Sequence, residues 1–208
     1  MPDDLLSVRN LTKRFGTQTV IKDLSFSIPK GDRVTLFAPS GAGKTTLINI
    51  LTRLDHNYEG EFSIEAKNIV TIFQEPRLFP YMTVEENIYL PMRIRRTMIT
   101  ESVMEKYQRW LRVCDLSACT WHYPYQLSGG MKQKVALIRG FLTEPDFVMM
   151  DEPFTSIDPS SKQKIIGHIL EAYPQTTILF VTHAVDEISL LTQSMLSFNS
   201  NRLLGAFA

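Results

Sequence analysis

A glycine-rich loop between an apolar strand and an apolar helix constrains this sequence more than any other feature. The loop, residues 38–46, reads APSGAGKTT and joins the β-branched and aromatic segment 34–37 to the apolar segment 47–51. Glycines let consecutive backbone N–H groups point inward, and the start of the following helix attracts an anion. A lysine followed by two threonines suits the phosphates and the metal ion of a nucleotide. The sequence therefore predicts a phosphate-binding loop rather than an ordinary turn before a helix.

Individual residues of this loop have separate predicted tasks. Lys44 would reach the β- and γ-phosphates, Thr45 would hold Mg²⁺, and Thr46 would bind another phosphate oxygen. The usual pattern begins with glycine where this chain has Ala38, and alanine suffices there if its φ is negative. At this point kinases, GTPases and many kinds of ATPase all remain open. The predicted nucleotide-binding residues of the loop are Ser40, Gly41, Ala42, Gly43, Lys44, Thr45 and Thr46.

Composition narrows the remaining classes of protein. The chain has 208 residues, enough for one domain, and its 22 Lys and Arg balance 22 Asp and Glu. Nucleic-acid binders usually carry a basic excess, so we expect no nucleic-acid partner. Uninterrupted apolar runs are about four residues long, whereas a membrane span needs roughly 20. The acidic start and the sparse pair Cys114 and Cys119 favour a cytoplasmic chain without a signal peptide, disulfide framework or zinc site.

Hydrophobic patterning predicts the order of the secondary structure. Three segments alternate as half-buried strands do, namely 6–8, 24–28 and 62–64. Four others are short and apolar, as strands buried on both faces are, namely 34–37, 69–73, 147–150 and 177–181. Residues 83–119 read as mostly helical, with Pro91 as an early break, and residues 131–142 show helical spacing. We therefore expect antiparallel strands, a parallel α/β core and a helical insertion before the core resumes near residue 147.

A second glycine motif points to a family. Residues 127–137 read LSGGMKQKVAL, so a serine hydroxyl and bare N–H groups would meet at the positive end of a helix and form a second phosphate site. The motif resembles the signature sequence of ATP-binding cassette (ABC) ATPases, with Met131 where glutamine is commoner. In that family the signature of one chain faces the phosphate loop of another, and a head-to-tail dimer encloses ATP. The resemblance implies ATP contacts for Ser128, Gly129 and Gly130.

An apolar strand that ends in two carboxylates strengthens this resemblance. Asp151 resembles the acidic residue of the family that holds Mg²⁺ through water. Glu152 resembles its general base, which polarises the water that attacks the γ-phosphate. Asp158 falls in a segment similar to the loop through which the two subunits sense each other and is implied to contribute to nucleotide binding. His183 resembles the histidine that contacts the γ-phosphate and the base.

Two further positions complete the implied site. Gln74 resembles the glutamine that reaches Mg²⁺ and water and joins the core to the helical lobe, and Phe15 resembles the aromatic residue that stacks on adenine. The resemblance therefore implies four catalytic residues, Lys44, Gln74, Glu152 and His183, and three metal ligands, Thr45, Gln74 and Asp151.

The same resemblance implies the fold and its parts. The fold class is α/β, a P-loop NTPase (RecA-like) parallel-sheet core with an antiparallel β lobe and a helical lobe. A single ABC ATPase domain would span residues 1–208. The core and β lobe would occupy about 1–75 and 145–208, and the helical lobe about 76–130.

Three segments are similar to the ATPases of nitrate, sulfonate and taurine importers, namely GGMKQ at 129–133, LFPYMTVEEN at 78–87 and VTHAVDE at 181–187. That type usually has Asp where this chain has Ala184, and lipoprotein-releasing and efflux relatives share parts of these motifs.

A soluble ABC ATPase of DNA repair or chromosome organisation would carry a long coiled coil, and the sequence has no sustained heptads. A catalytically inactive scaffold is disfavoured because the implied catalytic residues are intact.

Partners and location also follow from the resemblance. An importer ATPase is peripheral on the cytoplasmic face of the cell membrane and docks onto transmembrane permease subunits. An extracytoplasmic solute-binding protein acts with it indirectly, and these other subunits select the substrate. We expect at least two of the large side chains of residues 78–82, LFPYM, to line the groove that receives the permease. Arg93, Arg95 and Arg96 are expected to form a solvated helix face.

Overall fold

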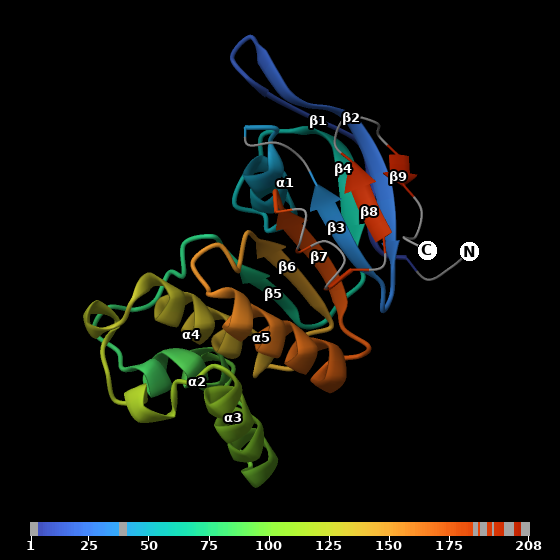
Figure 1. The fold of residues 1–208 in the computed structure, drawn as a ribbon. Helices are drawn as coiled ribbons and strands as arrows, with labels where there is room; N and C mark the ends of the chain where they lie inside the picture. Colours follow the sequence, from blue (N-terminus) through green and yellow to red (C-terminus); the bar gives the residue numbers. More distant parts are fainter. Residues whose placement is uncertain are drawn as a thin grey trace. The chain divides into compact units, whose positions relative to one another are not determined.

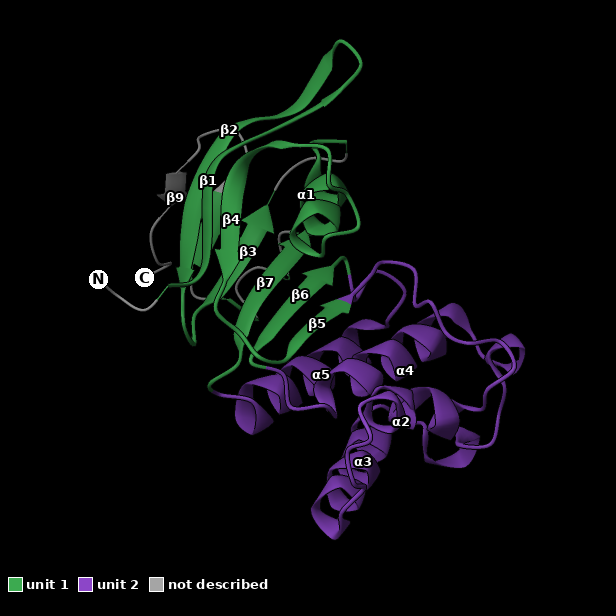
Figure 2. Ribbon diagram, turned by 180° about the vertical axis from the view of Figure 1, so that it is seen from behind, with its two compact units in different colours: residues 1–71, 146–152, 175–208 green, residues 72–145, 153–174 purple. Residues whose placement is uncertain are grey.

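The chain divides into two compact units (Figure 2). One comprises residues 1–71, 146–152 and 175–208, and the other comprises residues 72–145 and 153–174. The computed structural model describes residues 4–37, 41–184, 187, 191–192, 194–197 and 202–204. The span predicted as a helical lobe, about 76–130, falls within the second unit, which also takes in residues up to 145 and the segment 153–174.

An antiparallel sheet in the first unit contains three strands in the order β2-β1-β4. They are β1 (Asp4–Phe15), β2 (Gln18–Pro29) and β4 (Glu59–Ile64). Alternate residues of β1 are buried, including Leu6 and Val8, because successive side chains of a strand point to opposite faces. This alternation is the pattern from which the sequence predicted half-buried strands here.

A second sheet in the first unit has the strand order β5-β6-β7-β3-β8-β9 (Figure 1). Its members are β3 (Arg33–Phe37), β5 (Ile69–Ile72), β6 (Phe147–Asp151), β7 (Thr177–Thr182), β8 (Ser194–Ser197) and β9 (Arg202–Leu204). Strands β3, β6 and β7 are parallel, so their carboxyl ends meet at one edge. Every residue of β6 and β7 is buried, as the apolar runs predicted. Strands β8 and β9, which pair antiparallel to each other, were not predicted.

Helices dominate the second unit. They are α2 (Val84–Ile94), α3 (Glu101–Val113), α4 (Gly129–Phe141) and α5 (Pro159–Ala172), with the short 3-10 turns η1 (Ser117–Cys119) and η2 (Pro124–Gln126). Their core is aromatic: Trp110 packs against Phe141, His168 and Tyr173, and its Nε1 donates to the Tyr173 hydroxyl at 2.9 Å. None of the helices in the described ranges combines the length and apolarity of a membrane span.

Helix α2 does not break where the sequence suggested. It continues through Pro91 and ends at Ile94. The ring removes only the one N–H that would bond four residues back, and a Thr83–Glu86 capping box secures the start of the helix. The prediction of an early break at Pro91 was therefore wrong.

Candidate nucleotide site

The predicted phosphate loop leads directly into helix α1 (Lys44–Leu51), whose N-cap is Gly43. Gly43 has a φ of 93°, in the left-handed region, and a Cβ there would lie 2.7 Å from Cγ1 of Val20. Both the backbone and the available space therefore require glycine. Lys44 is buried, Thr45 is exposed, and Ala42 and Thr46 are partly exposed. Ser40 and Ala38 lie outside the described residues.

Asp151 ends strand β6 beside this loop. Its Oδ2 accepts a hydrogen bond from the Thr45 hydroxyl at 2.8 Å, and only 3% of the residue is exposed. Burial raises the pKa of Asp151, and the neighbouring Glu152 acts in the same direction, whereas the Thr45 hydrogen bond and Lys44 oppose the change. A hydroxyl and a carboxylate side by side are the hard oxygen donors that Mg²⁺ prefers, so these two residues fit a magnesium ion.

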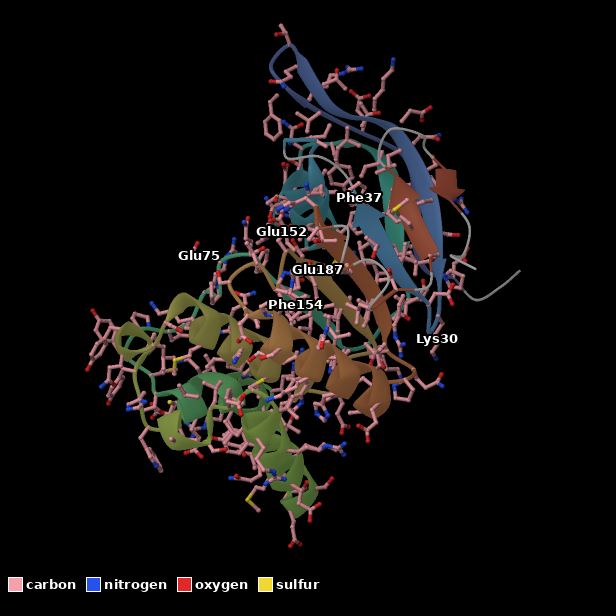
Figure 3. The ribbon with its side chains drawn as sticks, in the orientation of Figure 1. Lys30, Phe37, Glu75, Glu152, Phe154 and Glu187 are labelled. Atoms are coloured by element: carbon pink, nitrogen blue, oxygen red, sulfur yellow. The ribbon has the colours of Figure 1, made fainter. Side chains whose placement is uncertain are left out.

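Glu152 has a backbone conformation that is unusual for its residue type. Its φ is 47°, in the left-handed region, and its N–H donates to the Val181 carbonyl of β7 at 2.9 Å. This conformation costs a non-glycine residue about 1 kcal/mol or more. The bond to β7 holds Glu152 at the carboxyl ends of the strands, where Figure 3 also labels Phe37 of β3. Strained backbone of this kind clusters at functional sites.

The Glu152 carboxylate meets two basic side chains. Its Oε1 lies 2.9 Å from Nδ1 of His183 and 3.9 Å from Nζ of Lys44. The side chains of Lys44 and Glu152 are 6% and 12% exposed, whereas that of His183 is 50% exposed. A carboxylate so placed can accept a proton from water, while the lysine can bind phosphate oxygens. Lys44, Thr45, Asp151, Glu152 and His183 thus lie together in the first unit.

Phe15, the predicted adenine contact, stands at the end of β1 and is 53% exposed. Nζ of Lys13 lies 4.7 Å from the centroid of its ring. Lys13 itself is buried, pairs with Asp55 at 2.7 Å and donates to the Asn57 carbonyl. No predicted role fell on Lys13, although a lysine at an inward position of an alternating strand is a signal of a buried ion pair.

The serine and glycines of the second motif begin helix α4 in the other unit. The Ser128 hydroxyl accepts a hydrogen bond from the Met131 N–H at 3.3 Å. A Cβ on Gly130 would lie 2.5 Å from the Ser156 carbonyl oxygen, whereas one on Gly129 would meet its nearest neighbour at 3.9 Å. The close approach of the helix to the 155–158 loop therefore requires glycine at Gly130 only. Ser128 and Gly129 are exposed.

Helix α4 also fastens two loops that contain predicted site residues. The buried Lys134 donates to the Ser161 hydroxyl at 2.8 Å and lies 3.9 Å from the carboxylate of Asp158. Asp158 in turn caps α5 by accepting from the Ser161 N–H at 2.9 Å, and these local hydrogen bonds lower its pKa. No predicted role fell on Lys134, but it precedes Ile138 and Phe141 at helical spacing, which indicates an inward position.

The other fastened loop contains Gln74. Gln133 donates to the Phe73 carbonyl at 3.2 Å, and Arg139 donates to the carbonyls of Pro76 and Arg77 at 2.8 and 3.0 Å. Gln74 is exposed and belongs with Ser128, Gly130 and Asp158 to the second unit. Gln133 and Arg139 had no predicted role, because their partners are backbone carbonyls, which a residue motif does not reveal.

Known proteins match this chain over most of its length. A family model described as ABC transporter matches residues 21–155. The aliphatic sulfonates import ATP-binding protein SsuB of Bacillus cereus is 37% identical over 195 residues, which cover 88% of this chain and 76% of that protein. The spermidine/putrescine import ATP-binding protein PotA of Nitrosomonas eutropha is 33% identical over 207 residues, which cover 94% of this chain and 57% of that protein.

Solved structures agree with these matches. An ATP-binding subunit of an ABC transporter superposes with a TM-score of 0.83 at 27% identity, covering 93% of this chain and 85% of that chain. A dimeric ATP-binding cassette in a post-hydrolysis state, bound to ADP and Pi, superposes with a TM-score of 0.80 at 26% identity, covering 92% and 93%. The predicted fold class is confirmed by these similarities.

Proposed function

The chain belongs to the ABC transporter ATP-binding family, and we propose that it is the ATP-hydrolysing motor subunit of an importer of a small solute. The observation that carries the proposal is the cluster of Lys44, Glu152 and His183, with one carboxylate oxygen within 3.9 Å of both basic groups. ATP binding draws Lys44 towards the β- and γ-phosphates. Glu152 is then free to accept a proton from the attacking water, and His183 holds the carboxylate in place.

The hydrogen-bonded pair of Thr45 and Asp151 beside this cluster supports metal binding. Thr45 and Asp151 would hold Mg²⁺, Asp151 through water, and the bound ion would neutralise charge on the β- and γ-phosphates. Asp151 is buried, and its pKa is raised, so an arriving cation is favoured because it relieves the cost of the buried negative charge. Phe15 is exposed and stacks on the adenine ring.

A second copy of the chain completes the proposed site. Ser128, Gly129 and Gly130 offer a hydroxyl and N–H groups at the exposed start of α4, where an anion is favoured. They bind the γ-phosphate held by Lys44 of the other copy, so that two ATP molecules join two chains head to tail. Asp158 lies in the loop packed on Gly130 and responds to the partner. The dimeric state of the solved relative bound to ADP and Pi supports this arrangement.

The transport partner is a permease in the membrane, and the chain works as a peripheral subunit on its cytoplasmic face, indirectly coupled to a solute-binding protein outside. The buried Asn87 orders the loop 78–83 by accepting from the Phe79 N–H and donating to the carbonyls of Phe79 and Met82. Phe79 and Tyr81 project from this loop with 50% and 92% exposure. Such exposed aromatic side chains are typical of interface anchors. The similarity to a sulfonate importer favours an anionic sulfonate-like solute.

One substitution tests the site and the dimer together. Glu152→Gln keeps the shape of the side chain but cannot accept a proton, so bound ATP persists and dimers accumulate. Mg-free ATP should convert this variant from monomer to dimer. Analytical ultracentrifugation with and without the nucleotide should detect dimers only when it is present. Glu105→Gln, the same change on the exposed surface of α3, is the matched control and should remain monomeric.

A second substitution shows whether the dimer uses the proposed contacts. Adding Ser128→Arg to Glu152→Gln places bulk and charge at the γ-phosphate and should abolish the conversion to dimers, while each chain still binds ATP. A Glu152→Gln chain that binds ATP tightly yet stays monomeric at high concentration would contradict the proposal.

A further inference from the structure

A basic corner is formed where helix α2 ends, by Arg93, Ile94, Arg95, Arg96, Met98 and Ile99. The chain turns sharply there, because the Arg96 N–H donates to the Arg93 carbonyl at 3.1 Å and the Thr97 N–H donates to the Met92 carbonyl at 2.9 Å. All six residues are exposed, and Ile94 and Met98 reach 71% and 81%. The three arginines are exposed, as the sequence predicted, and the large apolar side chains Ile94 and Met98 are exposed beside them.

Local charge and apolarity together indicate the kind of surface that the corner fits. The whole chain has a formal net charge of zero, so three arginines within four residues are a concentration of positive charge. Glu86 interacts with Arg93, and Glu101 follows nearby at the start of α3. The three arginines therefore exceed these two carboxylates by one positive charge. A nucleic-acid site would pair such charge with aromatic stacking platforms, and the corner has aliphatic and thioether side chains instead. Arginines interleaved with aliphatic side chains match anionic headgroups above acyl chains.

We infer that the basic corner binds the surface of a membrane rich in anionic lipid. The guanidinium groups contact phosphodiester headgroups, and Ile94 and Met98 enter the headgroup–acyl boundary. Helix α2 has 11 residues, so the corner lies about 16 Å along the helix from the loop 78–83. This nearness to the membrane rests on the proposed function, in which that loop docks onto a permease. The lipid contact itself requires no permease and no nucleotide.

The backbone of Arg96 provides a precise test. Its φ is 54°, in the left-handed region that favours glycine. Arg96→Gly therefore removes a charge without straining the turn. The chain offers a matched control in Arg53, which has a φ of 59° and closes helix α1 in the same way, with the Leu54 N–H bonded to the Asn49 carbonyl. Arg53→Gly removes the same charge from the same kind of turn, in the first unit rather than in the basic corner.

The experiment measures sedimentation of the purified full chain with vesicles of equal parts phosphatidylglycerol and phosphatidylcholine, and with vesicles of phosphatidylcholine alone. We expect binding to the anionic vesicles only. Arg96→Gly should weaken it about fivefold, the factor that corresponds to about 1 kcal/mol per arginine near such a surface, and should flatten its salt dependence. Arg53→Gly should bind like the unchanged chain. Ile94→Ser with Met98→Ser should weaken binding without altering the salt dependence.

Three results would overturn the inference. The first is an equal loss of vesicle binding for Arg53→Gly and Arg96→Gly, and the second is equal binding to both kinds of vesicle. The third is release of the chain from vesicles by inorganic phosphate at the ionic strength of the control buffer, which would indicate a site for a soluble anion. Normal vesicle binding by Arg96→Gly together with lost permease co-purification would also overturn it, by assigning the corner to the permease. Calorimetric ATP binding, measured on the same samples, separates failure of the lipid contact from failure of the proposed function.

Discussion

Replacing Gly130 by alanine places a methyl group 2.5 Å from the carbonyl oxygen of Ser156. The obstacle is backbone, so the loop after Ser156 or the first turn of α4 must shift. Overpacking of this kind costs about 1–3 kcal/mol. At Gly129 the same methyl group would meet Ser156 at 3.9 Å, an ordinary contact, and alanine there gains up to about 1 kcal/mol of helix propensity.

The two alanine variants form a matched pair that thermal denaturation can separate. For a chain of this size, about 1 kcal/mol shifts Tm by roughly 2–4 °C, so Gly130→Ala should melt roughly 2–12 °C below the unchanged chain. Gly129→Ala should melt at the same temperature or slightly higher. On a Glu152→Gln background, Gly130→Ala should also impair ATP-dependent dimerisation. Equal melting temperatures for the two variants would refute the reasoning, because only the close approach to Ser156 distinguishes them.

Three other variants test separate parts of the molecule. Lys44→Ala should abolish ATP binding in calorimetry and phosphate release in an ATPase assay, because N–H groups alone cannot balance the phosphate charge; unchanged affinity and turnover would contradict its assignment. Asp151→Asn should raise the Tm of the nucleotide-free chain at neutral pH. The pKa of Asp151 is raised above its ordinary value of 3.8, so the ionised carboxylate destabilises the folded state at pH values above 3.8. That gain should shrink as the pH falls towards this value, and a constant gain would exclude ionisation as its cause. Phe79→Asp with Tyr81→Asp should leave basal ATPase activity intact but prevent co-purification with the permease; a normally stimulated complex would show that this loop does not dock.

The sequence was sufficient to predict those parts of the site whose functional residues lie at the end of a strand or the start of a helix. The segment from β3 through the glycine loop to α1 could be predicted because strand propensity, glycine and helix propensity change over within a few residues. Asp151 and Glu152 could be placed at a strand end because the preceding apolar run ends there. The family and the fold class followed from these motifs, and both are confirmed by the similar proteins and structures.

Features that depend on tertiary contacts could not be predicted. Strands β8 and β9 are short, and only pairing along β3 and with each other defines them. Glu152 and Arg96 adopt left-handed backbone without the glycine or asparagine that would announce it. Gln133 and Arg139 bind backbone carbonyls, which have no counterpart in a residue pattern.

Helix α4 couples two loops mechanically, because each loop is bound to side chains or backbone of the same rigid helix. One attachment, through Gln133 and Arg139, holds the segment 73–77, and the other, through Gly130 and Lys134, holds the segment 156–161. Neither segment can slide along the helix without breaking a hydrogen bond or opening a close contact. All four attachment points lie between residues 130 and 139 of one helix, a span of about 14 Å, so a displacement of one segment is carried to the other through that helix.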